Sequence, residues 1–83
     1  MVSVKALYGT NWCSDCIRLK EFLDEYDIPY LWIDLDKDEE AAKIVEKLNN
    51  GKRLIPTIVF SDGTFMVEPS KSVLGVKLGI DFD

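Results

Sequence analysis

The chain has 83 residues, a formal net charge of -5, and 47% hydrophobic and 30% charged residues. This length accommodates one small domain over residues 1–83, with a single core and no room for a second domain. No stretch approaches the roughly 20 apolar residues that span a bilayer, and the negative charge repels phosphate backbones and anionic lipids. The composition therefore indicates a soluble globular protein with no membrane and no nucleic-acid partner.

An apolar run opens the chain and leads to its only two cysteines. Residues 2–8 alternate in a pattern rich in strand formers, and Gly9-Thr10-Asn11 interrupts this pattern. The cysteines follow within Trp12-Cys13-Ser14-Asp15-Cys16, directly before a helical pattern. The start of the chain lacks the features of a secretory leader, so we expect a cytoplasmic, reducing compartment, where such a pair is seldom structural.

Residues 14–26 are predicted to form an amphipathic helix from the spacing of their apolar side chains. The residues on the apolar face are Cys16, Leu19, Phe22, Leu23 and Tyr26. Pro29 closes this helix. Residues 30–35 are at first apolar on both alternating faces, which predicts an interior strand covered on two sides.

A second helix is predicted after this strand. Asp36 or Asp38 is expected to cap it, and Asn50-Gly51 to end it in a left-handed conformation. The apolar stripe of this helix consists of Ala41, Ile44, Val45 and Leu48. We interpret the acidic residues near its start as capping and solvated groups, not as a metal site; they are Asp36, Asp38, Glu39 and Glu40.

The last third of the chain predicts a β-hairpin and a short helix. Residues 57–60 and 64–67 are rich in strand formers, and Ser61-Asp62-Gly63 between them offers a glycine where a turn needs positive φ. Pro69-Ser70 then leads into a short helix that Gly75 interrupts. Residues 80–83 are assigned to no element.

Together these elements predict an α/β fold of order βαβαββα. Its four-stranded mixed sheet carries helices on both faces, and a right-handed crossover makes the first two strands parallel. The cysteine pair then lies at the carboxyl edge of the first strand, where open sheets expose reactive groups.

The cysteine pair is the strongest candidate for chemistry. Cys13 lies at the expected helix N-terminus, where unpaired backbone N-H groups and the helix dipole stabilise a thiolate, so we expect it to be the attacking sulfur. Cys16 lies one turn further, with the two Cα atoms roughly 5 Å apart, so a disulfide can form with little backbone movement. Half of a zinc site or a structural disulfide is the alternative, but the chain has no histidine and no third cysteine to complete a zinc site.

The order of elements and several motifs resemble the glutaredoxin family, which has the minimal thioredoxin fold. The residues that carry the resemblance are Tyr8, Trp12-Cys13-Ser14-Asp15-Cys16, Arg53, Ile55-Pro56-Thr57 and Asp62-Gly63. Others are most similar to the mycoredoxin-like branch: Thr10, Arg18-Leu19-Lys20, residues 49–53 and Pro69-Ser70. The resemblance covers nearly the whole chain and implies a nucleophilic Cys13, a resolving Cys16 and a cis peptide bond before Pro56.

Several residues are candidates for substrate binding. Trp12 offers a flat apolar contact beside the cysteines, with simple core packing as the alternative. The backbone of Ile55, next to Pro56, is expected to pair with an extended substrate. Arg53 and Ser70 are candidate seats for a carboxylate, with a solvated arginine and a helix cap as the alternatives.

Asp15 is expected to contact substrate and to influence the sulfur beside it. Its carboxylate disfavours a thiolate on Cys13, although it also interacts favourably with the helix N-terminus. Arg18 offsets the first effect if its guanidinium folds back. We expect a more reducing potential than that of an Asp15→Asn variant.

The favoured function is an enzyme that reduces protein disulfides or mixed disulfides with low-molecular-weight thiols, as a monomer and without a cofactor. Glutathione-using members of the family typically carry a lysine near Thr10, a tyrosine at Asp15, and Gly-Gly followed by aspartate where this chain has Val67-Glu68-Pro69-Ser70. The expected electron donor is therefore another low-molecular-weight thiol or a flavoprotein reductase, with glutathione less favoured.

The alternative function is to bind or carry an iron-sulfur cluster. Some glutaredoxin relatives share a [2Fe-2S] cluster between two subunits, and Cys13 of each chain would then bridge a dimer. The presence of Cys16 and the missing glutathione features weigh against this function. Visible absorption of freshly purified protein separates the two hypotheses, because a dithiol enzyme is colourless.

Overall fold

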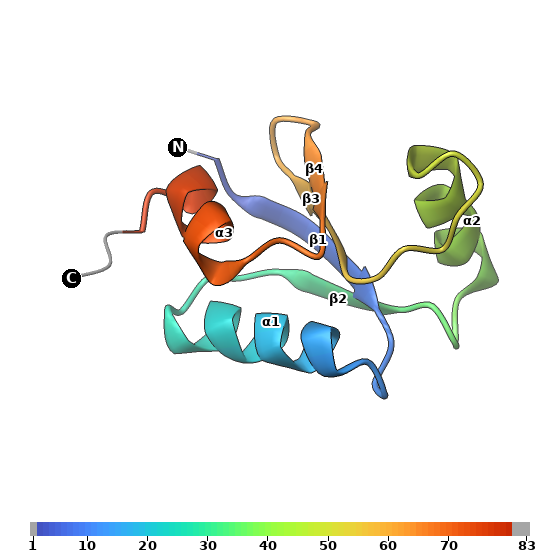
Figure 1. Cartoon of the computed structure of the whole chain (residues 1–83), viewed down its shortest axis with the longest axis horizontal. Helices are drawn as coiled ribbons and strands as arrows, with labels where there is room; N and C mark the ends of the chain where they lie inside the picture. Colours follow the sequence, from blue (N-terminus) through green and yellow to red (C-terminus); the bar gives the residue numbers. More distant parts are fainter. Residues whose placement is uncertain (1, 81–83) are drawn as a thin grey trace.

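The computed structural model describes residues 2–80 and contains a four-stranded mixed sheet (Figure 1). In chain order the elements are β1 (Val4–Gly9), α1 (Ser14–Glu25), β2 (Leu31–Asp34), α2 (Glu39–Leu48), β3 (Thr57–Phe60), β4 (Phe65–Val67) and α3 (Lys71–Leu78). This succession confirms the predicted order βαβαββα. Of the terminal segment that the sequence analysis left unassigned, residues 81–83 lie outside the described residues.

The strands follow the order β2-β1-β3-β4 across the sheet. Strand β1 pairs in parallel with β2, with Ala6 opposite Leu31, which confirms the predicted crossover. It pairs antiparallel with β3, with Leu7 opposite Ile58, and β3 forms the hairpin with β4. The strand that ends just before the cysteines is therefore one of the two central strands of the sheet.

The prediction that the second strand is interior is wrong, because β2 lies at an edge of the sheet. Both of its faces are indeed covered, since Trp32 packs against one hydrophobic cluster and Ile33 against the other. Its first residue, Leu31, is 61% exposed. Apolar residues on both faces indicate that both faces are packed, but they do not show whether both backbone edges are paired.

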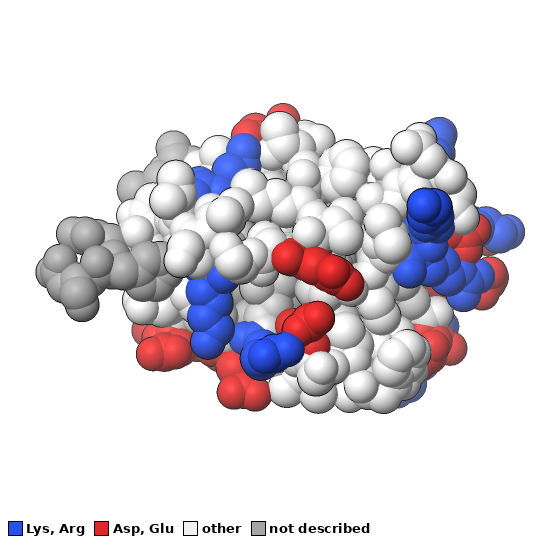
Figure 2. All heavy atoms as spheres, in the orientation of Figure 1, with Lys and Arg blue, Asp and Glu red and all other residues white. Residues whose placement is uncertain are grey.

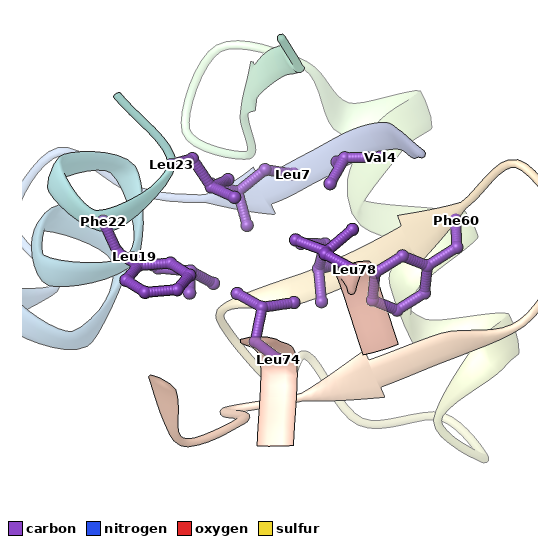
Figure 3. Packing of buried hydrophobic residues seen from close by; sticks show 9 residues of the cluster. Val4, Leu7, Leu19, Phe22, Leu23, Phe60, Leu74 and Leu78 are labelled. Atoms are coloured by element: carbon purple, nitrogen blue, oxygen red, sulfur yellow. The ribbon is translucent and has the colours of Figure 1, made fainter. Parts of the chain in front are cut away.

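Two hydrophobic clusters lie on opposite faces of the sheet. The first joins β1 and β3 to α1 and α3, and Figure 3 shows its side chains pointing toward one another; it consists of Val4, Leu7, Leu19, Phe22, Leu23, Ile58, Phe60, Leu74 and Leu78. The second joins β1 to α2 and contains Ala6, Tyr8, Leu35, Ala41, Ala42 and Val45. An irregularity in the β1-β3 register between Val4 and Ala6 brings Val4 onto the face of Leu7. Helices thus cover both faces, as predicted.

Helix α2 begins at the N-cap Asp38, whose side chain accepts the N-H of Ala41 at 3.0 Å. One of the two predicted caps is therefore confirmed. The predicted apolar stripe is partly wrong, because Ile44 is 48% exposed while Ala42 is fully buried. The buried face of this helix therefore consists of Ala41, Ala42 and Val45, and Ile44 lies outside it. Asn50 and Gly51 follow the helix with φ of 56° and 91°, as predicted.

The hairpin turn and α3 are tied together by one carboxylate. Gly63 has the positive φ (88°) that the turn requires. Asp62 accepts bonds from both the N-H and the hydroxyl of Thr64 and from the ammonium of Lys77 on α3, and these contacts lower its pKa. Ser70 caps α3 by accepting the N-H of Val73 at 3.2 Å. Within residues 2–80, no helix has both the length and the apolar character needed to cross a membrane.

Candidate active site

Cys13 is the N-cap residue of α1, as its position in the sequence predicts. Its Sγ accepts the backbone N-H of Cys16 at 3.2 Å, and its carbonyl accepts the N-H of Ile17 at 3.0 Å. Cys13 is half-buried, so it is more exposed to solvent than the buried Cys16. This geometry directs a free backbone donor and the positive end of the helix dipole at the Cys13 sulfur, which favours its anionic form.

Cys16 is fully buried one turn further along α1. Burial raises the pKa of its thiol from the ordinary value of 9.0 to about 12, and its interactions with Cys13 and Asp15 act in the same direction. Both cysteines are free thiols in this structure. Near neutral pH, Cys16 is therefore a protonated thiol that is buried from solvent, whereas Cys13 is partly exposed.

The raised pKa of Cys16 predicts a pH-dependent stability of the reduced protein. Because the folded state binds this proton more tightly than the unfolded state, the contribution is complete below pH 9 and is lost as the pH rises toward about 12. Urea unfolding in the presence of reductant should show an additional fall approaching about 1.4 kcal/mol per pH unit above pH 9. A Cys16→Ala variant should lack this additional fall, whereas Tyr30, whose pKa is also raised to about 12 by burial and by Asp24, contributes equally to both proteins. Parallel curves for the two proteins would contradict the prediction.

Gly9 and Thr10 lie against Cys16, and neither was identified from the sequence as a site residue. Gly9 ends β1, and a Cβ atom placed on it would lie 2.5 Å from the Sγ of Cys16 and 3.0 Å from the Trp32 ring. Thr10 is 4% exposed, and its hydroxyl has no hydrogen-bond partner. The sequence identifies Gly9 only as part of the segment that ends the first strand. No pattern among its neighbours in the chain indicates that the Sγ of Cys16 lies next to it.

Asp15 and Arg18 form an ion pair on the outer face of α1. The guanidinium of Arg18 donates to the Asp15 carboxylate, so the condition under which Arg18 offsets this carboxylate is met. Their side chains are 52% and 65% exposed, so water screens the pair and its effect on Cys13 is modest.

A surface pocket of about 320 Å³ lies beside this ion pair. It is lined by Asp15, Arg18, Leu19, Pro56, Glu68, Pro69, Ser70 and Lys71. Figure 2 shows acidic side chains near the middle of the face in view, with basic side chains below and to the left of them. The pocket brings together three of the predicted binding residues, Asp15, Pro56 and Ser70, and adds Glu68 and Lys71, which were not predicted.

Arg53 is not among the residues that line this pocket. Its guanidinium instead bonds two carboxylates of α2, those of Glu46 and Glu39, and both raise its pKa. These bonds hold the end of the α2-β3 loop against α2. A role for Arg53 in binding a substrate carboxylate stays a prediction. In that role, the substrate carboxylate would compete with Glu46 and Glu39 for the guanidinium.

The bond between Ile55 and Pro56 is cis, as the resemblance implied. Pro56 is fully buried, and the side chain of Ile55 packs against the cluster beneath α2. The carbonyl of Pro56 accepts the N-H of Glu68 at 2.9 Å. This bond joins the proline loop to the segment that leads into α3, so two of the segments that line the pocket are connected to each other.

Trp12 is 72% exposed, which excludes the alternative that it serves only as core packing. Its indole N-H donates to the carboxylate of Asp36 at 2.8 Å. Asp36 was predicted as a possible helix cap, but Asp38 takes that role. Within residues 2–80, no group of three or more histidine, cysteine or acidic side chains is arranged to hold a metal ion.

The sheet order and the two-cysteine motif at the start of α1 define a protein of the thioredoxin-fold class of redox proteins. The chain belongs to the glutaredoxin family, because the Glutaredoxin family model matches residues 6–66. It is 45% identical over 74 residues to mycoredoxin 1 of Corynebacterium glutamicum, covering 87% of this chain and 89% of that protein.

Two solved structures are similar to the whole fold. A mutant of the thioredoxin-like protein BC3987 matches with a TM-score of 0.76 and 26% identity, covering 95% of this chain and 97% of the other. A glutaredoxin from Archaeoglobus fulgidus matches with a TM-score of 0.73 and 28% identity, covering 94% and 87%. Family membership assigns a general role in thiol-disulfide redox chemistry.

Proposed function

We propose that this protein is a dithiol oxidoreductase in which Cys13 attacks a substrate disulfide and Cys16 resolves the intermediate. The observation that carries this proposal is the asymmetry of the two sulfurs. Cys13 is partly exposed and accepts a backbone N-H, whereas Cys16 is buried with a pKa raised to about 12 by burial. Only one of the two thiols is therefore prepared to attack first.

The reaction proceeds by two thiol-disulfide exchanges. The Cys13 thiolate attacks one sulfur of the substrate disulfide, forms a mixed disulfide and releases the other sulfur as a thiolate, which takes up a proton. Cys16 then loses its proton and attacks the Cys13 sulfur, which forms the internal disulfide and releases the second substrate thiol. The protein is oxidised by two electrons and the substrate is reduced by two, and an external thiol or reductase restores the dithiol.

The substrates that fit this site are protein disulfides and mixed disulfides with a small thiol. Membership of the glutaredoxin family supports a thiol reductant; we propose a low-molecular-weight thiol as electron donor, and a flavoprotein reductase is the other candidate. The pocket lined by Asp15, Pro56 and Ser70 is the proposed seat of the small thiol, and the backbone of Ile55 the edge for an extended substrate. We propose that the protein acts as a monomer in the cytoplasm.

Alkylation by iodoacetamide tests the order of the two sulfurs. Cys13 should react about fivefold faster than free cysteine at pH 7, because a helix N-terminus stabilises a thiolate by roughly 1 kcal/mol. Cys16 should react only after unfolding in urea. A Cys13→Ser variant serves as the control and should incorporate no label in its folded state. Labelling of Cys16 first, or of Cys13 no faster than free cysteine, would refute the proposal.

The Asp15→Asn variant tests the electrostatic balance at the site. Removing the carboxylate stabilises the Cys13 thiolate and thus the reduced form, so the potential should become less reducing. Because Arg18 already pairs with Asp15 at the surface, we expect a change of only about 10–20 mV. Equilibration with a reference thiol pair measures it, and Glu25→Gln at the far end of α1 should leave the potential unchanged. A shift toward a more reducing potential would contradict the inference that the Asp15 carboxylate disfavours the Cys13 thiolate.

A further inference from the structure

Glu68 has a backbone conformation that its side chain disfavours. Its φ of 47° lies in the left-handed region, where the Cβ atom of an ordinary residue comes too close to a carbonyl oxygen. Asp27 and Asn50 also have positive φ, but their short side chains tolerate this region, in which glutamate is uncommon. Pro69 follows directly, and a residue before proline normally takes an extended conformation. The backbone at position 68 therefore favours asparagine or glycine over glutamate.

Contacts on both sides of Glu68 hold this conformation. Its N-H donates to the carbonyl of Pro56 at 2.9 Å, and the preceding residue, Val67, pairs with Thr57 in the β3-β4 hairpin. Disfavoured backbone conformations persist where the surrounding structure fixes them, and they are most frequent at functional sites. The side chain is exposed, and within residues 2–80 its carboxylate forms no hydrogen bond or ion pair. Neither the backbone nor a bond within the described chain therefore explains why this residue is a glutamate.

Glu68 determines the charge of the pocket beside the cysteines. Two acidic and two basic residues line this pocket: Asp15, Glu68, Arg18 and Lys71. Asp15 and Arg18 neutralise each other as an ion pair, which leaves the carboxylate of Glu68 and the ammonium of Lys71. With both groups present the lining has no net formal charge, whereas without Glu68 it would be positive. A pocket with a positive lining attracts anions, so Glu68 removes an attraction that Lys71 would otherwise exert.

We propose that Glu68 is a specificity-determining residue that cancels the attraction of Lys71 for anions and thereby lets this pocket select small thiols without a net charge. The inference rests on the proposed function, in which the small-thiol half of a mixed disulfide occupies the pocket, and it adds the charge class of that half. Glu68 acts through its charge and takes no part in the exchange of sulfur bonds.

The test compares two small disulfides of similar size in single turnovers of the pre-reduced protein. One is 2-hydroxyethyl disulfide, which is uncharged, and the other is dithiodipropionate, which carries a carboxylate on each half. The measured quantity is the ratio of the second-order rate constants, anionic over uncharged. Each variant's ratio is divided by the wild-type ratio, so the intrinsic reactivities of the two disulfides cancel. A single turnover needs no electron donor, so the identity of the reductant does not enter the measurement.

The Glu68→Gln variant should raise this ratio about threefold, the size expected for one exposed charge, whereas Glu68→Asp keeps the charge and should keep the wild-type ratio. Lys71→Gln should lower the ratio by a similar factor, and the double variant of Glu68→Gln and Lys71→Gln should return it to about the wild-type value. Glu25→Gln, at the far end of α1, changes the net charge of the protein equally and is the matched control. An unchanged ratio in Glu68→Gln, or an equal rise in Glu25→Gln, would overturn the proposal.

Urea unfolding tests the backbone argument separately. Glu68→Asn and Glu68→Gln both remove the charge, but asparagine tolerates the left-handed conformation, so the Glu68→Asn variant should unfold at a higher urea concentration. Equal or reversed midpoints would refute the inference that glutamate stands here against the preference of the backbone. Failure of the proposed function is distinguishable, because the wild-type protein would then reduce neither disulfide.

Discussion

Replacing Cys13 with serine is expected to lower the rate of disulfide reduction more than about 1,000-fold, because a serine hydroxyl supplies no thiolate at neutral pH. Serine is also a favourable N-cap, and its oxygen can accept the N-H that the Cys13 sulfur accepts in this structure. Helix α1 should therefore remain intact. The loss would report the chemistry of the sulfur and not a change of fold.

The matching Cys16→Ser variant should behave differently. Its Cys13 still attacks, but the second exchange cannot occur, so the protein should accumulate as a mixed disulfide with its substrate. Mass spectrometry of the protein after exposure to a disulfide measures this adduct, and adducts isolated from cells would identify the natural partner. Equal residual activity in the two variants would show that either cysteine can begin the reaction and would contradict the assigned roles.

The Gly9→Ala substitution is expected to have the next largest effect. A methyl group at this position would lie 2.5 Å from the Sγ of Cys16, 3.2 Å from its Cβ and 3.0 Å from the Trp32 ring. Cys16 is fully buried, so its sulfur cannot move away from the added methyl group without displacing the side chains around it. Such overpacking typically costs about 1–3 kcal/mol of stability, and the displaced sulfur would resolve the mixed disulfide more slowly.

Two measurements separate these consequences of the Gly9→Ala change. Urea unfolding of the reduced protein gives the loss of stability, and single turnovers give the rate of the second exchange. Combining the change with Cys16→Ala removes the nearest atom, so the loss of stability in that background should be smaller. A Gly9→Ala protein with unchanged stability and unchanged turnover would show that the close approach of strand end and sulfur has no consequence.

Local patterns predicted the elements of this fold because each depends on residues close in the chain. Asn50 and Gly51 take the left-handed conformation that ends α2, and Gly63 takes it in the hairpin turn. Ser70 caps α3, and Cys13 occupies the cap of α1. For the asparagine, the glycines and the serine, the residue type alone favours the backbone conformation or the bond to a nearby N-H, whereas Cys13 was placed by the start of the helical pattern.

The expectations that failed concern how elements meet. The apolar residues of β2 indicated packed faces, yet the strand lies at the sheet edge. Helical spacing identified α2, but it placed Ile44 on the buried face of the helix, where the structure buries Ala42 instead. The ion pairs of Arg53 with Glu39 and Glu46 were likewise not predicted, although they leave its role in substrate binding a prediction. No local pattern contains these pairings.

The sequence by itself determined the order of elements, the caps and the position of the two sulfurs, because these follow from residue spacing and short-range hydrogen bonds. Only the tertiary structure decided that Cys16 is buried against Gly9, that Trp12 is held by Asp36, and that Glu68 and Lys71 line the pocket with Asp15. These contacts join residues from separate elements, and the packing of sheet and helices, which no local segment encodes, brings them together.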